Sequence, residues 1–152
     1  MKNFLLKKMA IPCVILMLVI CMIFSGCASR RSVSAEEFSA ACESAGFTLE
    51  DSSSLFDSSF VSAALLYNEG ECSIGYYSFA KAADAKSYYA QYFSGVYAGT
   101  SEEKFIDSTE YNRYIVSTDS GLVLLYRNGN NLIYLAGPDG ESLNAIVEEL
   151  GI

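Results

Sequence analysis

The sequence predicts a single α+β domain in which an antiparallel meander sheet carries its helices packed on one face. Segments with helical spacing of apolar residues alternate with groups of strand-like segments, in the order helix, strands, helix, strands, helix. Short turn sequences separate consecutive strand-like segments, and strands joined in this way must run antiparallel. Residues 34–152 are enough for one domain of ordinary size with a proper core.

The first helix begins at a capping box, because Ser34 is followed three residues later by Glu37. One face of this helix is apolar and consists of Phe38, Ala41, Cys42 and Ala45. Gly46 suits the end of the helix. A short strand at Phe47–Glu50 and a loop rich in Ser and Asp at Asp51–Ser59 are expected to follow.

A hairpin is predicted next, with strands at Val61–Tyr67 and Glu71–Phe79 joined by Asn68-Glu69-Gly70. The second helix covers Ala82–Phe93. Its apolar residues recur at helical spacing and are mostly aromatic: Ala85, Tyr88, Tyr89, Tyr92 and Phe93.

The segment Ser94–Glu110 is long for a connection inside a compact domain, and such segments are often functional or contain an unrecognised element. Ser101–Phe105 suits a further helical turn. This segment is therefore where specificity is first expected.

Three more strands are predicted, at Tyr111–Thr118, Leu122–Arg127 and Asn131–Ala136. The strongest hairpin signal is Asn128-Gly129-Asn130, between the last two. A final helix at Glu141–Leu150 ends at Gly151. A helix followed by a meander thus occurs twice, which suggests a weak internal duplication.

Two of these strands are apolar at every position, over Leu122–Tyr126 and Leu132–Ala136. A sheet with one face in water should instead alternate polar and apolar residues. Either these strands are central with both faces covered, or one face exposes an apolar patch to a partner.

The N-terminus has the composition of a secretory signal peptide. Lys2, Lys7 and Lys8 precede an apolar run at Met9–Phe24, and small residues follow it. The run is shorter than the roughly 20 residues of a membrane-spanning helix. We therefore expect this segment to be a signal for export.

Cys27 follows Ser25-Gly26, and this ending resembles the lipobox of bacterial lipoproteins, although Phe24 replaces the usual Leu. The resemblance implies cleavage between Gly26 and Cys27, which removes residues 1–26, and a diacylglyceryl group on the Cys27 thiol. It places the protein at the cell membrane, lipid-anchored on the extracytoplasmic face. Residues 27–33 would then form a short tether to a domain at 34–152. The alternatives to this lipoprotein signal are an ordinary secretory signal and an uncleaved anchor.

The remaining chain resembles small uncharacterised lipoproteins of clostridia and related Firmicutes. The segments that carry the resemblance are Ser25-Gly26-Cys27, Ala35-Glu36-Glu37-Phe38 through Ala45-Gly46-Phe47, Asp84-Ala85-Lys86-Ser87-Tyr88-Tyr89, and Leu150-Gly151. It implies a monoderm surface lipoprotein and brings no activity and no site residues.

Composition excludes several function classes. The net charge is −8, and residues 1–26 contribute lysines but no acid, so the exported part is strongly acidic and is not expected to bind nucleic acid. The absence of histidine removes Ser-His and Cys-His pairs and most zinc sites. No phosphate-binding glycine motif is present. We expect no cofactor, no metal and no catalytic residues.

Two cysteines, Cys42 and Cys72, remain in the exported domain. Both are expected to point at one core. Outside the cytoplasm such a pair either forms a disulfide or persists as two buried thiols, and the sequence leaves both alternatives open.

Tyrosine is enriched, with 11 tyrosines and no tryptophan. Tyrosine offers rigid contact area with a polar tip, which suits recognition of peptides or sugars. The candidate binding surface is therefore Tyr76, Tyr77, Tyr97, Tyr111 and Tyr114. The alternative is that these residues fill the core and its rim.

These observations favour a non-enzymatic, lipid-anchored module that binds a protein, peptide or glycan at the envelope. The alternative is a structural or inhibitory accessory subunit of an envelope complex.

Overall fold

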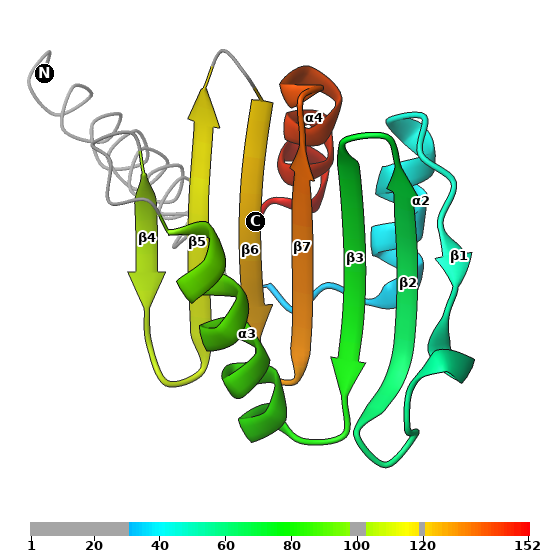
Figure 1. Ribbon diagram of the computed structural model, residues 1–152, viewed down its shortest axis with the longest axis vertical. Helices are drawn as coiled ribbons and strands as arrows, with labels where there is room; N and C mark the ends of the chain where they lie inside the picture. Colours follow the sequence, from blue (N-terminus) through cyan, green and yellow to red (C-terminus); the bar gives the residue numbers. More distant parts are fainter. Residues whose placement is uncertain (1–30, 98–102, 119–120) are drawn as a thin grey trace, which may run out of the picture.

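A seven-stranded antiparallel sheet lies at the centre of the computed structural model, which describes residues 31–97, 103–118 and 121–152 (Figure 1). The strands are β1 (Glu50–Asp51), β2 (Val61–Glu69), β3 (Cys72–Phe79), β4 (Lys104–Asp107), β5 (Tyr111–Thr118), β6 (Gly121–Asn128) and β7 (Asn131–Gly137). The helices are α2 (Ala35–Ser44), α3 (Ala82–Val96) and α4 (Gly140–Leu150), with a 3₁₀ turn at Ser53–Leu55.

Two meanders form the sheet, whose strand order is β1-β2-β3-β7-β6-β5-β4. The first meander, β1 to β3, joins the second where β3 pairs with β7, with Ile74 opposite Leu135. Helix α3 makes the crossing from β3 to β4 at the far edge. The predicted α+β class and antiparallel sheet are confirmed, and a helix followed by a meander does occur twice in the chain.

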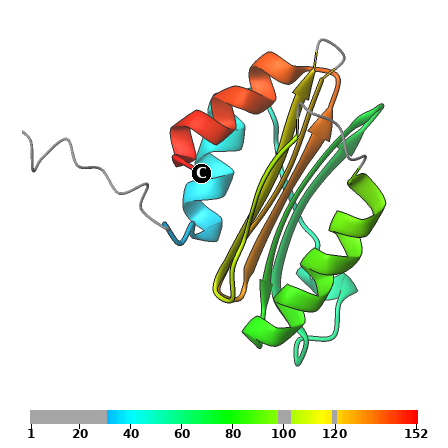
Figure 2. The same cartoon turned by 90° about the vertical axis from the view of Figure 1, so that its left-hand side faces the viewer.

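The predicted placement of every helix on one face is wrong. Helices α2 and α4 cover one face, whereas α3 lies alone on the other (Figure 2). Each helix has an apolar stripe, and a stripe indicates that a helix is packed without indicating which face of the sheet receives it. The all-apolar strands are therefore covered on both faces, which is the first of the two alternatives that the sequence left open.

Strand β6 shows how the two cores alternate. Leu122, Leu124 and Tyr126 belong to the core under α2 and α4, while Leu125 belongs to the core under α3. Successive side chains of a strand point to opposite faces, so a strand between two helical layers needs apolar residues at every position.

The helix boundaries follow the predicted signals. Ser34 and Glu37 form the reciprocal capping box of α2, and Gly151 ends α4 in the left-handed conformation. None of the helices in the described parts of the chain combines the length and apolar character needed to cross a membrane.

The segment Ser94–Glu110 contains an element that the sequence pattern did not reveal. Lys104–Asp107 is strand β4, paired with β5 so that Phe105 lies opposite Tyr114. The helical turn predicted at Ser101–Phe105 is therefore wrong for Lys104 and Phe105, which lie in β4. Four residues are too few to show a period of two, and the partner strand stabilises β4.

Candidate functional site

The five tyrosines proposed as a binding surface do not form one. Tyr76, Tyr77 and Tyr114 are buried, with 3%, 9% and 0% of their surface exposed, and Tyr111 is half-buried with its ring 5.4 Å from that of Tyr126. Both faces of the sheet are covered, so both members of the Tyr76-Tyr77 doublet enter a core. Only Tyr97, 48% exposed, lies at the surface.

Cys42 and Cys72 belong to the same core, as predicted. Cys42 lies on the buried face of α2, and Cys72 packs against the same cluster. Both are free thiols in the structure. Burial raises the pKa of Cys42 to about 12, and the neighbouring Cys72 acts in the same direction. Cys27 lies outside the described residues.

Helix α3 builds the side of the molecule that has an open, aromatic surface. Ala85 is buried against the sheet, and its small side chain permits close packing. One turn further, Tyr89 stacks on Phe93, with ring centres 5.9 Å apart and planes 10° apart. The aromatic stripe then continues beyond the end of the helix.

At the β4 edge of the sheet this stripe meets other aromatic rings. We call Phe93, Tyr97, Phe105 and Tyr114 the edge cluster. The ring of Phe93 lies 5.0 Å from Tyr97, 5.3 Å from Tyr114 and 6.3 Å from Phe105. Tyr114 anchors the cluster in the core, whereas Phe105 is 59% exposed. The exposed part of the edge cluster therefore consists of Tyr97 and Phe105.

The Tyr114 hydroxyl ties this cluster to the backbone. It lies 2.6 Å from the Glu103 carboxylate and 3.1 Å from the Val96 carbonyl oxygen. Burial first, and then the hydrogen bond to Glu103, raise the pKa of Tyr114. The phenol therefore stays protonated and acts as a structural donor.

Beside the edge cluster is a cavity of about 200 Å³ between α3 and the β4–β5 hairpin; we call it the edge cavity. Its walls are lined by Lys86, Tyr89, Ala90, Phe93, Phe105, Asp107 and Asn112. Aromatic walls with a few polar groups at one end are typical of ligand sites. A hollow of about 260 Å³ next to Val116 and Val123 lacks aromatic walls, and one of about 380 Å³ next to Leu66 has a single aromatic lining residue, Tyr67.

The polar end of the edge cavity rests on a buried arginine. Arg127 and Asn112 are each only 1% exposed. The Arg127 Nε donates to Asn112 Oδ1 at 2.5 Å, and the Asn112 amide donates in turn to the Asp107 carboxylate. Arg127 also donates to the carbonyl oxygens of Thr109 and Gly129, at 2.9 and 3.0 Å.

This network fixes the charges around the cavity. Burial lowers the pKa of Arg127, and the negative charge of Asp107 opposes that effect. Burial and the Asp107 charge raise the pKa of Tyr89 to about 12. Near neutral pH the network therefore contains a charged guanidinium and a protonated phenol, and the side chain of Asp107 is held by Asn112.

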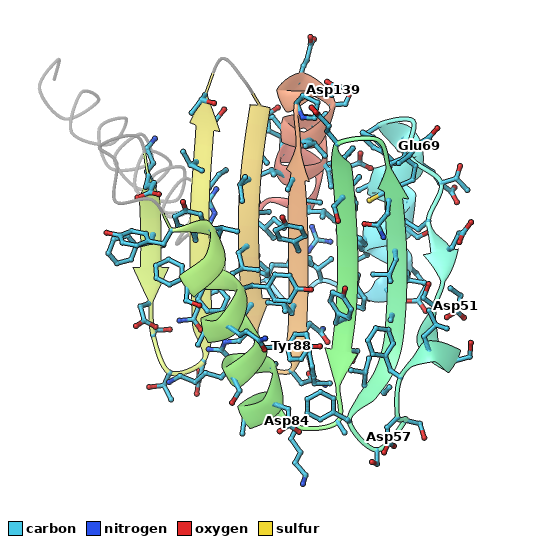
Figure 3. The ribbon with its side chains drawn as sticks, in the orientation of Figure 1. Asp51, Asp57, Glu69, Asp84, Tyr88 and Asp139 are labelled. Carbon is cyan, nitrogen blue, oxygen red and sulfur yellow. The ribbon has the colours of Figure 1, made fainter. Side chains whose placement is uncertain are left out.

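Acidic side chains elsewhere do not converge on a second site. Figure 3 shows Asp51, Asp57, Glu69, Asp84 and Asp139 at separate points around the rim of the domain. Within residues 31–97, 103–118 and 121–152 no group of three or more Cys, Asp or Glu side chains is arranged to hold a metal ion.

Sequence reasoning missed most residues of the edge cavity. Phe105 and Asp107 lie in the segment singled out for specificity, but in a strand that was not recognised. The sequence pattern places Asn112 and Arg127 in strands and assigns them no further role. The signal that could have identified them is a polar residue in each of two strands that pair in the sheet, because Asn112 lies opposite Arg127.

No protein-family model, no curated protein and no solved structure matches this chain.

Proposed function

We propose that this protein is a lipid-anchored, extracytoplasmic binding module without enzymatic activity, and that the edge cavity receives its ligand. The observation that carries the proposal is Phe105. A phenyl ring that is 59% exposed lies at the rim of a cavity whose polar wall includes the buried, hydrogen-bonded Asn112 and the exposed Asp107. Exposed aromatic groups beside a shaped cavity are typical of recognition sites.

The chemistry of the cavity favours binding over catalysis. General-base catalysis near neutral pH needs a group whose pKa lies near 7. The pKa of Tyr89 is about 12, so this phenol cannot accept a proton there. Asp107 is the one carboxylate among the residues that line the cavity, so the wall offers no pair of carboxylates for acid–base chemistry. The polar groups are suited to orienting a ligand.

The lining indicates what kind of group fits. The rings of Phe93 and Phe105 offer apolar contact at one end, and Asp107 and Lys86 offer opposite charges at the other. A peptide side chain, or a sugar ring with its hydroxyl groups, has this combination of an apolar part and a polar part. The partner is therefore a protein, peptide or glycan at the envelope.

The membrane anchor is the second part of the proposal and rests on the signal sequence and on Cys27. A single acyl chain binds membranes weakly, whereas two or more chains hold a protein stably. Mass spectrometry of the mature N-terminal peptide should find Cys27 as the first residue with the mass of a diacylglyceryl group. An unmodified Cys27 would contradict this part.

A photo-crosslinker tests the cavity. Benzoylphenylalanine is placed at Phe105 and, in a control protein, at Leu55, an apolar side chain 77% exposed at the opposite edge of the sheet. After irradiation of intact cells we expect a defined adduct from position 105 and none from position 55. Each of the two crosslinker proteins is also made with Asp107→Asn, which removes the charge of this side chain and keeps a hydrogen-bond acceptor.

The adduct at position 105 should weaken with Asp107→Asn if the ligand uses the cavity. Equal adducts from positions 105 and 55, or an adduct that is unchanged by Asp107→Asn, would reverse the proposal.

The accessory-subunit alternative is favoured by one observation, the outer edge of β4. Among the described residues no strand pairs with that edge, and Ile106 is 50% exposed on it. An unpaired apolar edge can accept a strand of another protein. A co-purifying partner that is lost with Ile106→Lys but kept with Asp107→Asn would favour this alternative.

A further inference from the structure

The segment that leads into the first helix is fastened to the sheet. Residues Arg31–Val33, which we call the strap, cross one face of the sheet before α2 begins (Figure 1). Val33 is 1% exposed and belongs to the core under α2 and α4. The sequence pattern predicted a tether as far as residue 33, but the strap already belongs to the fold.

Side chains from three different strands hold the strap. The Tyr126 hydroxyl of β6 donates to the Arg31 carbonyl oxygen at 2.5 Å. The Val33 carbonyl oxygen accepts from the Tyr76 hydroxyl of β3 at 3.2 Å and from the Asn131 amide of β7 at 3.1 Å. These contacts tie both ends of the strap to rigid strands.

All of these contacts lie toward one end of the sheet. Tyr126 is two residues before the end of β6, and Asn131 begins β7, so the strap crosses near the β6–β7 turn. The β4–β5 turn lies at the same end, because the Gly129 amide donates to the Glu110 carbonyl oxygen. We call this the turn end; the β2–β3 turn, with Glu71, lies at the opposite end.

We propose that the strap orients the domain on the membrane, with the turn end facing the lipid bilayer. This inference rests on the proposed lipid anchor at Cys27. Arg31 lies four positions after Cys27, and four residue steps of fully extended chain span at most about 14 Å. The clamped Arg31 therefore holds the domain within that distance of the lipid.

Strand geometry decides which end is within reach. At about 3.3 Å per residue, the turn end lies roughly 7 Å from Tyr126 along β6, and the opposite end lies roughly 17 Å away. The anchor reaches at most about 14 Å, which is longer than the distance to the turn end and shorter than the distance to the opposite end. Asp107 and Asn112 of the edge cavity lie next to the turn end, so the cavity opens close to the bilayer surface.

The strap can be tested without a membrane, using the purified full chain. Trypsin cleaves after arginine, and the bond after Arg31 is the one whose carbonyl oxygen Tyr126 holds. Tyr126→Phe removes only that hydroxyl. The loss of one hydrogen bond should raise the cleavage rate about fivefold. In the control, Tyr134→Phe changes a β7 tyrosine that packs against the α3 core and should leave the rate unchanged.

The orientation is tested in vesicles that contain brominated phosphatidylcholine, which quenches tryptophan fluorescence on contact. The chain has no tryptophan, so each variant carries a single reporter. Glu110→Trp reports on the turn end, and Glu71→Trp makes the same change of charge at the opposite end. Both positions are exposed turn residues.

We expect at least threefold stronger quenching at position 110 than at position 71, and a smaller ratio when Tyr126→Phe and Tyr76→Phe release the strap. Equal quenching in a protein that floats with the vesicles would overturn the orientation and leave the lipid anchor standing. Failure to float would overturn the anchor itself. Equal tryptic cleavage in the Tyr126→Phe and Tyr134→Phe variants would overturn the strap.

Discussion

Replacing Asn112 by alanine should destabilise the protein by about 3 kcal/mol. The change removes the acceptor of the Arg127 Nε–H and leaves that donor unpaired in a site that is 1% exposed. A hydrogen bond to a buried charged group contributes about 1.5–3 kcal/mol. The two bonds that the Asn112 amide donates, to Asp107 and Ser108, and the small void left by its side chain add to this amount.

Urea denaturation followed by circular dichroism measures the effect, because urea leaves the ionic strength unchanged. With a slope of about 1–3 kcal/mol per molar urea, the midpoint should fall by roughly 1–3 M. Asn144→Ala is the matched control. Its amide donates to Glu148 at 3.0 Å on the exposed face of α4, so its loss should cost less than about 0.5 kcal/mol.

A double-mutant cycle separates this reasoning from a general loss of packing. If the unpaired guanidinium causes the loss, then Arg127→Met should remove much of the penalty of Asn112→Ala, with a coupling energy of about 2 kcal/mol. Additive effects of the two changes, or an Asn112→Ala variant as stable as Asn144→Ala, would refute the role given to this hydrogen bond.

The core at Phe38, the turn at Gly121 and the two thiols each permit one measurement. Phe38→Ala should cost about 3–5 kcal/mol in thermal or urea unfolding, because the ring is fully buried. Gly121→Ala would place a Cβ atom 2.2 Å from the Gly137 carbonyl oxygen and should cost more than Gly70→Ala, where the space is open. At pH 8 iodoacetamide should label the half-buried Cys72 before Cys42, whose pKa is about 12; no labelling without reductant would instead indicate a disulfide. Because the folded pKa of Cys42 exceeds its ordinary value of 9.0, its stabilising effect is complete below pH 9 and is lost as the pH rises to about 12. Urea midpoints should therefore fall less steeply over that range in Cys42→Ala.

Most of the secondary structure could be predicted because each element has its own local signal. The capping box at Ser34, the turn at Gly129 and the stop at Gly151 all lie where the structure has them. These signals depend on residues that are neighbours in sequence. The helical and strand periods depend on the same short range, and so they survive in the folded chain.

The arrangement of the helices depends on longer-range packing and was not predictable in the same way. Which face of the sheet receives α3 is decided by the crossing from β3 to the far edge strand β4. The burial of Tyr76 and Tyr77 follows from that choice, since a second helical layer turns the outer face of β3 into a core. The tyrosines that enrich the sequence therefore lie in the two cores and, at Tyr97, at the rim of the domain.

The polar network of the edge cavity was missed for a related reason. Asn112 and Arg127 lie fifteen residues apart, and only the pairing of β5 with β6 places them opposite each other. A polar residue in an otherwise apolar strand needs a buried partner. The sequence shows that Arg127 needs a buried partner, and the strand register identifies Asn112 as that partner.

Two consecutive residues of β6 connect the proposed anchor to the proposed site. Tyr126 points to one face of the sheet and holds the strap, while Arg127 points to the other face and holds Asn112 and the β4–β5 turn. Adjacent strand residues are separated by about 3.3 Å along the chain. The proposed ligand site and the proposed lipid anchor are therefore positioned by the same end of the same strand. If the anchor is correct, the cavity meets partners that lie at the membrane surface, and a longer tether would place it beyond them.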